Sequence, residues 1–323
     1  MAKEKQKRGL FGWLKKGPWI LTLAAIVALL VFVVSVMIIN SRKPQYHDVR
    51  SLGESIRGGY FVRINQILIK EMADNWLPND IFWPTVFLDN MPNFQIGELE
   101  VVRYNIRVLR DNLSRMRTTD KLDADVDKAF TSLSNDPYKW WFPSAESKWK
   151  EANKHLDAYY RNLRAGKSHF YPRADNLIQL LGQYASLMGG VNTRLINAPR
   201  DIKEALPVEQ GQEKTTSPEK PVDVNIPWYK VDDNFYYAQG VAYALHESLQ
   251  AIRLDFLAVL TDKNSLGLVD KILEDLSRCN FEPLIVFNGH PGSIFANHSL
   301  NLSGIFNDAR QKINSLITAL AQG

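Results

Sequence analysis

Residues 97–118 read GELEVVRYNIRVLRDNLSRMRT, and this stretch decides the class of fold. Its apolar residues recur at alternating steps of three and four positions, while four arginines and an aspartate lie between them. That spacing places apolar side chains on one face of an α-helix. The stripe consists of Leu99, Val102, Ile106, Leu109, Leu113 and Met116. The stretch therefore predicts an amphipathic helix that buries one face in a core.

The same helical spacing continues on both sides of this stretch. Ser144 can cap a helix that opens at Ala145, and Gly189-Gly190 is expected to stop another. Loops separate the periodic segments, so the pattern favours a bundle over one long coiled coil. We therefore predict a mainly α protein. The remaining helices are expected over 119–134, 145–163, 177–188, 191–206, 231–261, 266–277 and 299–321.

A different signal precedes the bundle. Residues 19–39, WILTLAAIVALLVFVVSVMII, contain no charged side chain. As a helix they would reach roughly 30 Å, the thickness of a hydrocarbon core. A buried core helix is disfavoured, because the segment is apolar on every face and follows a basic tail, and the h-region of a cleaved signal peptide is shorter. The segment therefore predicts an uncleaved transmembrane helix that anchors the chain in the lipid bilayer.

The charges flanking this segment predict its orientation. Residues 1–43 hold eight Lys and Arg against one Glu, which leaves 31 basic and 34 acidic residues in 44–323. Six of the eight basic residues precede the apolar run. The positive-inside bias then places residues 1–18 in the cytoplasm and the folded part in the periplasm of a bacterial inner membrane. The folded part is not basic, so no nucleic-acid partner is expected.

Residues 207–227 differ in composition from both neighbouring regions. They combine four prolines with a polar stretch, which indicates a flexible linker or an exposed insertion. The helical regions 44–206 and 228–323 on either side are expected to share one core, with two separate domains as the alternative.

In the apolar run 19–39, Ala24 and Ala28 form a small-xxx-small pair. That pair could bring two anchors together as a homo-oligomer, or it could face lipid.

Sequence motifs of enzymes are missing from the chain. It has no phosphate-binding loop, no dinucleotide fingerprint, no H-E-x-x-H, no C-x-x-C and no G-x-S-x-G. His290 and His298 share one loop, but that loop supplies no carboxylate or thiolate to complete a metal site. His47 is isolated and expected to be solvated, and Cys279 is expected to be a buried thiol. We therefore predict no catalytic residue, no metal and no cofactor.

One aromatic segment interrupts the helical pattern. Residues 75–94, NWLPNDIFWPTVFLDNMPNF, hold three prolines and five large aromatics, flanked by carboxylates. Such a segment can be a packed cap over the bundle, or a groove for glycan or peptide, where paired carboxylates act about 5–10 Å apart. The same alternatives apply to Trp140-Trp141-Phe142. The candidate ligand or partner surface consists of Trp76, Asp80, Trp83 and Asp89.

The layout resembles a family of uncharacterised proteobacterial single-pass inner-membrane proteins, classed as a domain of unknown function. The resemblance rests on the basic tail and anchor of 1–43, WLPND at 76–80, FWP at 82–84, WWFPSAE at 140–146 and YYAQG at 236–240. It implies a membrane-anchored envelope protein of a gammaproteobacterium. It implies no catalytic residues.

Two functions fit these observations. The first is a non-enzymatic interaction or scaffold protein of the cell envelope, with envelope proteins as partners. The second is a periplasmic protein that binds or processes peptidoglycan glycan through residues 75–94. An enzyme is the less favoured class, because no motif supports one.

Overall fold

The structure is a computed structural model that describes residues 18–81, 83–117, 119–197, 231–283, 286 and 297–322. Within these residues the chain forms ten α-helices and no β-strand. The prediction of a mainly α fold with an N-terminal apolar helix is confirmed. The basic tail before Pro18 and the predicted linker 207–227 lie outside the described residues.

The helices are joined by connections of very different length, some of which contain short helical turns. A 3-10 turn, η3 (Thr85–Phe87), lies in the aromatic segment, another, η2 (Val49–Leu52), precedes α2, and a π-helical turn, η4 (Leu109–Leu113), extends α3. In chain order the helices are α1 Pro18–Asn40, α2 Gly59–Asp74, α3 Asn90–Val108, α4 Ala124–Leu133, α5 Ala145–Arg164, α6 Ala174–Asn197, α7 Val231–Asp255, α8 Leu257–Asp262, α9 Leu266–Arg278 and α10 His298–Ala321.

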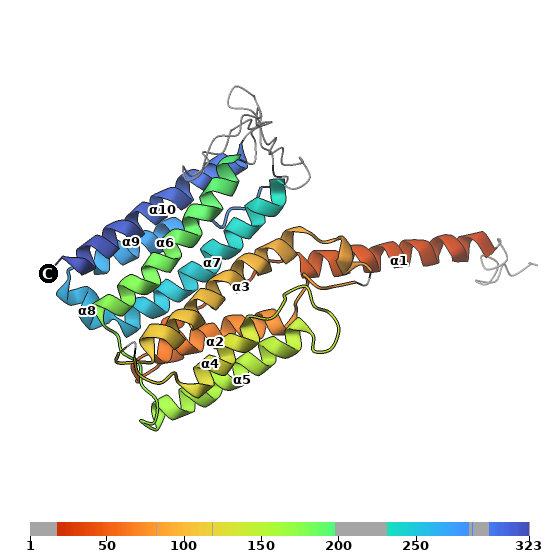
Figure 1. Cartoon of the computed structure of the whole chain (residues 1–323). Helices are drawn as coiled ribbons and strands as arrows, with labels where there is room; N and C mark the ends of the chain where they lie inside the picture. The colour runs from red at the N-terminus through yellow and green to blue at the C-terminus, as the bar shows by residue number, and fades with distance from the viewer. Residues whose placement is uncertain are drawn as a thin grey trace, which may run out of the picture.

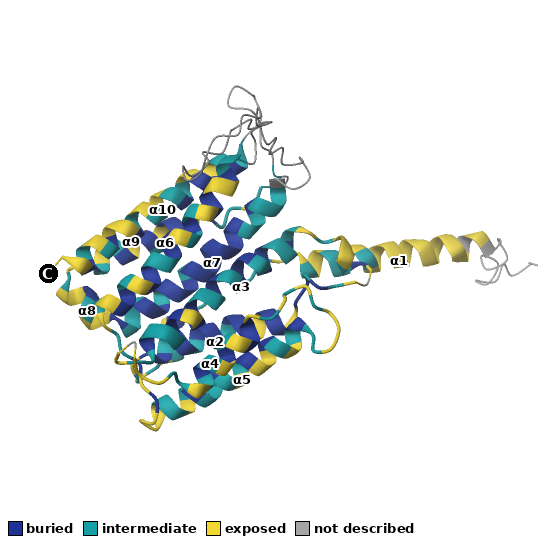
Figure 2. Ribbon diagram, in the orientation of Figure 1, coloured by how far each residue is buried: buried dark blue, intermediate teal, exposed yellow. Residues whose placement is uncertain are grey.

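Helices α3 and α7 form the centre of the bundle. Figure 1 shows α6, α9 and α10 on one side of this pair and α2, α4 and α5 on the other. Buried residues are concentrated along the inner helices (Figure 2), and those on both sides of residues 198–230 contribute to a single hydrophobic core. Burial of these apolar faces is the main favourable term in folding.

Two glycines allow α3 and α7 to touch. A methyl group on Gly97 would lie 2.2 Å from the Tyr237 carbonyl oxygen, and one on Gly240 would lie 1.9 Å from the Phe94 carbonyl oxygen. Both distances are far inside van der Waals contact. The two helices can therefore pack backbone against backbone only because both positions lack a Cβ.

A buried polar network joins four helices of the bundle. The amide nitrogen of Asn105 on α3 donates to Asn65 Oδ1 on α2 at 2.9 Å and to Ser248 Oγ on α7 at 2.7 Å. The Tyr184 hydroxyl on α6 donates to Asn105 Oδ1. A buried network whose members are hydrogen-bonded to one another helps to specify how these helices are set against one another.

The predicted stop at Gly189-Gly190 is wrong. Helix α6 runs through both glycines to Asn197. A glycine inside a helix costs roughly 0.5–1 kcal/mol relative to alanine. Here packing against α10 compensates, since Arg310 Nε donates to the Ala185 carbonyl and the guanidinium lies over Gly189.

Helix α2 was not predicted from the sequence. It has no capping side chain of its own, because Gly58 occupies its N-cap. The cap comes instead from Asp255 at the end of α7, whose carboxylate accepts from the Gly58 nitrogen at 3.0 Å and from the Phe61 nitrogen at 2.7 Å. A cap supplied almost two hundred residues away leaves no local sequence signal.

Helix α1 projects from one end of the bundle (Figure 1). Within it, the stretch Leu21–Asn40 is long and apolar enough to cross a membrane, and none of that stretch is buried inside the protein. The C-terminal part of α1 contacts η3 in the aromatic segment. The apolar helix and the aromatic segment therefore lie at the same end of the molecule.

Candidate functional site

The aromatic segment is attached to the bundle at its base. The Leu77 nitrogen donates to Gln95 Oε1 at 2.9 Å, and Gln95 Nε2 donates to the Asn75 carbonyl at 2.6 Å. Leu77 and Gln95 are both buried. The segment between α2 and α3 therefore leaves the core in a fixed direction.

Trp76 belongs to the core rather than to a surface. It is 3% exposed, and its ring meets Trp149 of α5 edge-on with centroids 5.6 Å apart. Its indole nitrogen donates to the Pro137 carbonyl at 2.8 Å. This placement corrects the prediction that put Trp76 on a ligand surface: an indole that reaches a carbonyl partner can be buried at little polar cost.

The α2–α3 loop is also tied to the α4–α5 loop. Besides the bond from Trp76, Asn79 Nδ2 donates to the Lys139 carbonyl at 3.2 Å. Both loops lie at the end of the bundle from which α1 projects (Figure 1). The two aromatic stretches of the sequence, 75–94 and 140–142, are thus parts of one structure.

These two loops carry most of the exposed apolar side chains of the domain. Outside α1, the described residues include ten exposed large hydrophobic side chains, and eight belong to the loops. Phe142 is the most exposed of them, at 88%. We call this set the aromatic surface: Ile81, Trp83, Val86, Phe87, Tyr138, Trp140, Trp141 and Phe142.

The acidic residues near the aromatic segment differ in their hydrogen-bond partners and in how deeply they are buried. The Asp89 carboxylate accepts from the Asn90 nitrogen at the start of α3, and Asp80 lies in a turn closed by its own nitrogen and the Leu77 carbonyl. Glu98 points into the core and is 3% exposed. Of the predicted residues, Trp83 and Asp89 are exposed, Asp80 is partly exposed and Trp76 is buried.

A second cluster lies around His47, where the chain after α1 packs against α2 and α7. Its backbone nitrogen and ring Nδ1 meet the Glu247 carboxylate of α7 at 3.2 and 3.1 Å, and its Nε2 lies 3.1 Å from Glu71 Oε1 of α2. The hydrogen bonds to Glu247 and Glu71 raise the pKa of His47 to about 10. The expectation that His47 is solvated is wrong; it is an imidazolium held between two carboxylates.

The carboxylates of this cluster differ in their protonation. Burial alone would raise the pKa of Glu247, but hydrogen bonds with His246 and His47 bring it below its ordinary value. Burial, reinforced by Glu71 and Glu247, raises the pKa of Glu98 well above its ordinary value. Burial therefore favours the protonated form of Glu98, which lies beside the charged triad. Sequence reasoning missed this cluster, because its members come from separate segments with no shared spacing.

The cluster fastens the chain that follows α1. The Tyr46 ring lies between Tyr243, at 5.5 Å between centroids, and His246, at 4.2 Å. Lys43 lies over the Tyr236 ring and 3.4 Å from Glu282. These contacts and the His47 triad hold residues 43–47 against α7. The cluster thus has a clear structural task, which is to connect the apolar helix rigidly to the bundle.

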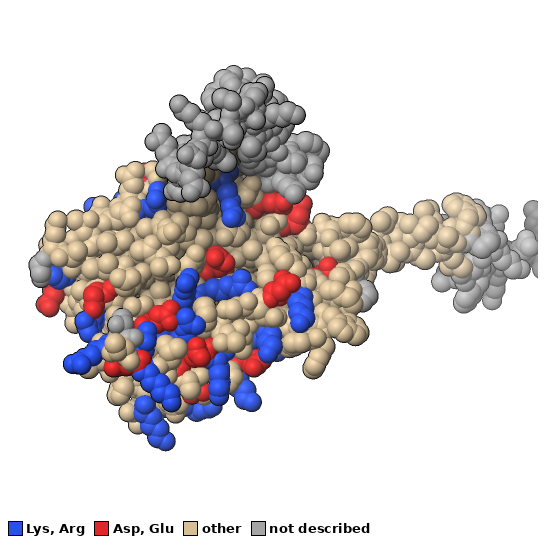
Figure 3. Space-filling model, in the orientation of Figure 1, with Lys and Arg blue, Asp and Glu red and all other residues tan. Residues whose placement is uncertain are grey.

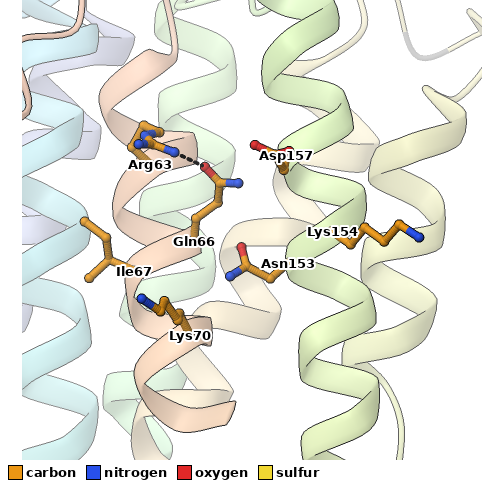
Figure 4. A pocket seen from close by; sticks show the side chains of 7 residues that line it. All are labelled: Arg63, Gln66, Ile67, Lys70, Asn153, Lys154 and Asp157. Carbon is orange, nitrogen blue, oxygen red and sulfur yellow. Dashed lines mark hydrogen bonds between the residues drawn. The ribbon is translucent and has the colours of Figure 1, made fainter. Parts of the chain in front are cut away.

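A shallow groove lies between α2 and α5 (Figure 4). Arg63, Lys70 and Lys154 line it together with Asp157. Arg63 donates to Gln66 Oε1 at 3.2 Å and lies over the Tyr160 ring, so one of the cations is already engaged. The groove has the mixed charge of an ordinary solvated surface.

A family model for uncharacterised proteins conserved in bacteria, DUF2333, matches residues 13–323. The chain belongs to this family. The match confirms the resemblance to a domain of unknown function and covers both the apolar helix and the helical bundle. No curated protein and no solved structure matches the chain.

The sequence predictions also concern the thiol of Cys279 and the two histidines of the 288–299 loop. Cys279 is fully buried, as predicted, and burial raises the pKa of its thiol to about 12. Among the described residues no group of three or more His, Cys, Asp or Glu is arranged to hold a metal ion. His290 lies outside the described residues.

Proposed function

We propose that this DUF2333 protein is a single-pass protein of the bacterial inner membrane whose periplasmic helical domain is a non-enzymatic interaction or scaffold module. Helix α1 would be the anchor, with the basic residues before it in the cytoplasm. The family match supports a bacterial protein, and the length and apolarity of α1 support a membrane span.

The observation that carries the proposal is the aromatic surface. In the part of the chain that the structure describes, eight of the ten exposed large hydrophobic side chains outside α1 are gathered on two loops that hydrogen bonds tie together. Scattered apolar side chains are normal on a protein surface, but a contiguous apolar patch marks an interaction site. The ionisable cluster around His47 supports the same proposal, because its groups are engaged in holding the chain to α7.

The proposal predicts that specific envelope proteins accompany the full-length chain. Capture of the tagged protein from cross-linked membranes should enrich a reproducible set of proteins over a control that carries only residues 1–43. A matched variant, Phe142→Ser with Trp141→Ser, then separates partners that contact the aromatic surface from partners that contact other faces. A full-length sample that enriches nothing beyond the control contradicts the scaffold function.

A second candidate function is binding of peptidoglycan glycan, which exposed tryptophans favour because sugar rings stack on indole faces. Trp83 and Trp141 are 52% and 68% exposed, so both could stack on a sugar. This function predicts that the detergent-solubilised protein sediments with purified peptidoglycan. Trp83→Ala should then reduce sedimentation without changing the unfolding transition.

The matched variant Trp76→Ala should behave in the opposite way. Because Trp76 is buried against Trp149, its removal leaves a cavity and should cost about 3–5 kcal/mol of stability. Wild-type protein that stays in the supernatant removes the glycan function. Sedimentation that Trp83→Ala leaves unchanged removes the aromatic surface as its site.

A further inference from the structure

We propose that the partner of the aromatic surface is the lipid bilayer itself: Trp83, Phe87, Trp140, Trp141 and Phe142 lie in the headgroup region beside α1, and the domain rests on the membrane. The inference rests on the proposed function, because it names what the exposed surface of that function contacts. It adds a second membrane contact to the one made by the anchor helix.

The residue types fit a membrane interface. Six of the eight side chains of the aromatic surface are Trp, Tyr or Phe. Trp and Tyr are enriched where a membrane meets water, since they combine an apolar ring with a polar group. The flanking Ile81 and Val86 are 46% and 45% exposed, and are apolar enough to lie at the boundary of the acyl chains. A surface of this composition gains free energy when it leaves water for that region.

The position of the surface fits equally well. Helix α1 touches η3, which includes Phe87 of the aromatic surface. Trp76 and Asn79 tie the second loop, with Trp140 and Trp141, to the first. Figure 3 shows that the part of the domain nearest α1 carries few charges, while Lys, Arg, Asp and Glu gather over the side that holds α4 and α5. On the face that Figure 3 draws, the end of the domain next to the membrane that α1 would span therefore carries few charges.

The link between anchor and domain is too short to let them separate. Helix α1 ends at Asn40, and Lys43 is already held by Glu282 and the Tyr236 ring. Three residues of extended chain span at most about 10 Å. The headgroup region is roughly 5–7 Å thick on each side of the hydrocarbon core. The link therefore keeps the domain within about 10 Å of the end of α1, and the direct contact between α1 and η3 brings this end of the domain as close as the headgroups.

The aromatic surface is also preorganised. Gln95 fixes the base of the first loop, and the bonds to Pro137 and Lys139 fix the second loop relative to it. Because the loops are ordered by contacts within the protein, binding does not have to supply that ordering free energy. The remaining alternatives, a second copy of the chain or a protein partner on this surface, are outcomes of the test below.

The test measures how near each surface lies to lipid in the full-length protein. Cys279 is buried, so single cysteines introduced at exposed sites can be labelled with a fluorophore in the otherwise natural sequence. Phe87→Cys and Phe142→Cys report on the aromatic surface. Met116→Cys and Leu257→Cys are matched controls, because both are exposed hydrophobic residues away from these loops. Each variant is reconstituted in phosphatidylethanolamine–phosphatidylglycerol vesicles containing bromolipid.

Bromolipid should quench the labels at 87 and 142 at least about threefold more strongly than those at 116 and 257, because only the first pair would lie within the headgroup region. The difference should persist when the protein is diluted in lipid. Equal quenching at all four sites would overturn the proposal. A difference that disappears on dilution also overturns it and identifies a second copy as the occupant. A label site that disturbs the unfolding transition is replaced by Trp141→Cys.

Failure of this inference is distinguishable from failure of the proposed function. Labels that remain in water, together with envelope proteins that the Trp141→Ser, Phe142→Ser variant no longer captures, assign the surface to a protein partner and leave the scaffold function standing. Labels in lipid with no captured protein support the membrane contact and remove the scaffold function.

Discussion

Gly240→Ala is expected to destabilise the helical domain by about 3 kcal/mol or more, at the upper end of what overpacking costs. The added methyl would lie 1.9 Å from the Phe94 carbonyl oxygen, which belongs to the backbone of α3. A side chain could rotate away, but a helix backbone cannot, so α3 and α7 must move apart. Chemical denaturation of the full-length protein in detergent, followed by tryptophan fluorescence, measures the loss.

A matched control lies on α10. A methyl group on Gly304 would meet nothing within 4 Å, so Gly304→Ala should leave stability unchanged or raise it by about 0.5 kcal/mol through helix propensity alone. Gly97→Ala should resemble Gly240→Ala, because its methyl would lie 2.2 Å from the Tyr237 carbonyl oxygen. Equal stability of the Gly240 and Gly304 variants would contradict the close crossing of α3 and α7.

This crossing shows how far the sequence alone can lead. The stripe in residues 97–118 predicted a helix with one buried face, and Leu99, Val102, Ile106, Leu109 and Leu113 are buried. The prediction is wrong for Met116, which lies beyond the end of η4 and is exposed. Periodicity reports which face of a helix is apolar. It does not report which other helix covers that face, so the pairing of Gly97 with Gly240 was not predictable.

Local signals succeeded where the physical cause was local. Ser144 was predicted to cap α5, and its side chain accepts from the Ser147 nitrogen. They failed where the cause was distant: the α2 cap comes from Asp255, and Gly189 inside α6 is supported by Arg310 of α10. The exposure of Trp76 and Trp83 was not predictable for the same reason: Trp76 is buried because Trp149 and the Pro137 carbonyl, both distant in sequence, contact it, whereas Trp83 is exposed.

The ion triad at His47 leads to the second prediction. His47→Ala removes the imidazolium partner of Glu247, a side chain with no exposed surface, and leaves it the backbone nitrogen of residue 47 and His246 at 3.7 Å. Breaking a buried pair on one side costs about 3–5 kcal/mol, because the remaining charge is uncompensated. We therefore expect a loss of about 3 kcal/mol. His155→Ala, which removes a partly exposed pair with Asp125 at 3.8 Å, is the matched control and should cost less than about 1 kcal/mol.

The free energy of unfolding of the wild type and of His47→Ala should depend differently on pH above neutrality. The pKa of His47 is about 10 in the folded protein, above its ordinary value of 6.5, so the triad stabilises the fold fully below that ordinary value. The stabilisation that the triad provides is lost as pH rises from 6.5 toward about 10, the pKa of His47 in the folded protein. Glu98, whose pKa is also raised, lowers stability in the same direction in both proteins.

The free energy of unfolding of the wild type should therefore fall more steeply than that of His47→Ala between about pH 7 and 10. Parallel curves for the two proteins would show that His47 carries no proton linked to folding. Because His47 also holds the chain that follows α1 against α7, the variant has a second consequence at neutral pH. It should weaken the coupling between anchor and domain, and thereby lower bromolipid quenching of a label at Phe142 without changing one at Leu257.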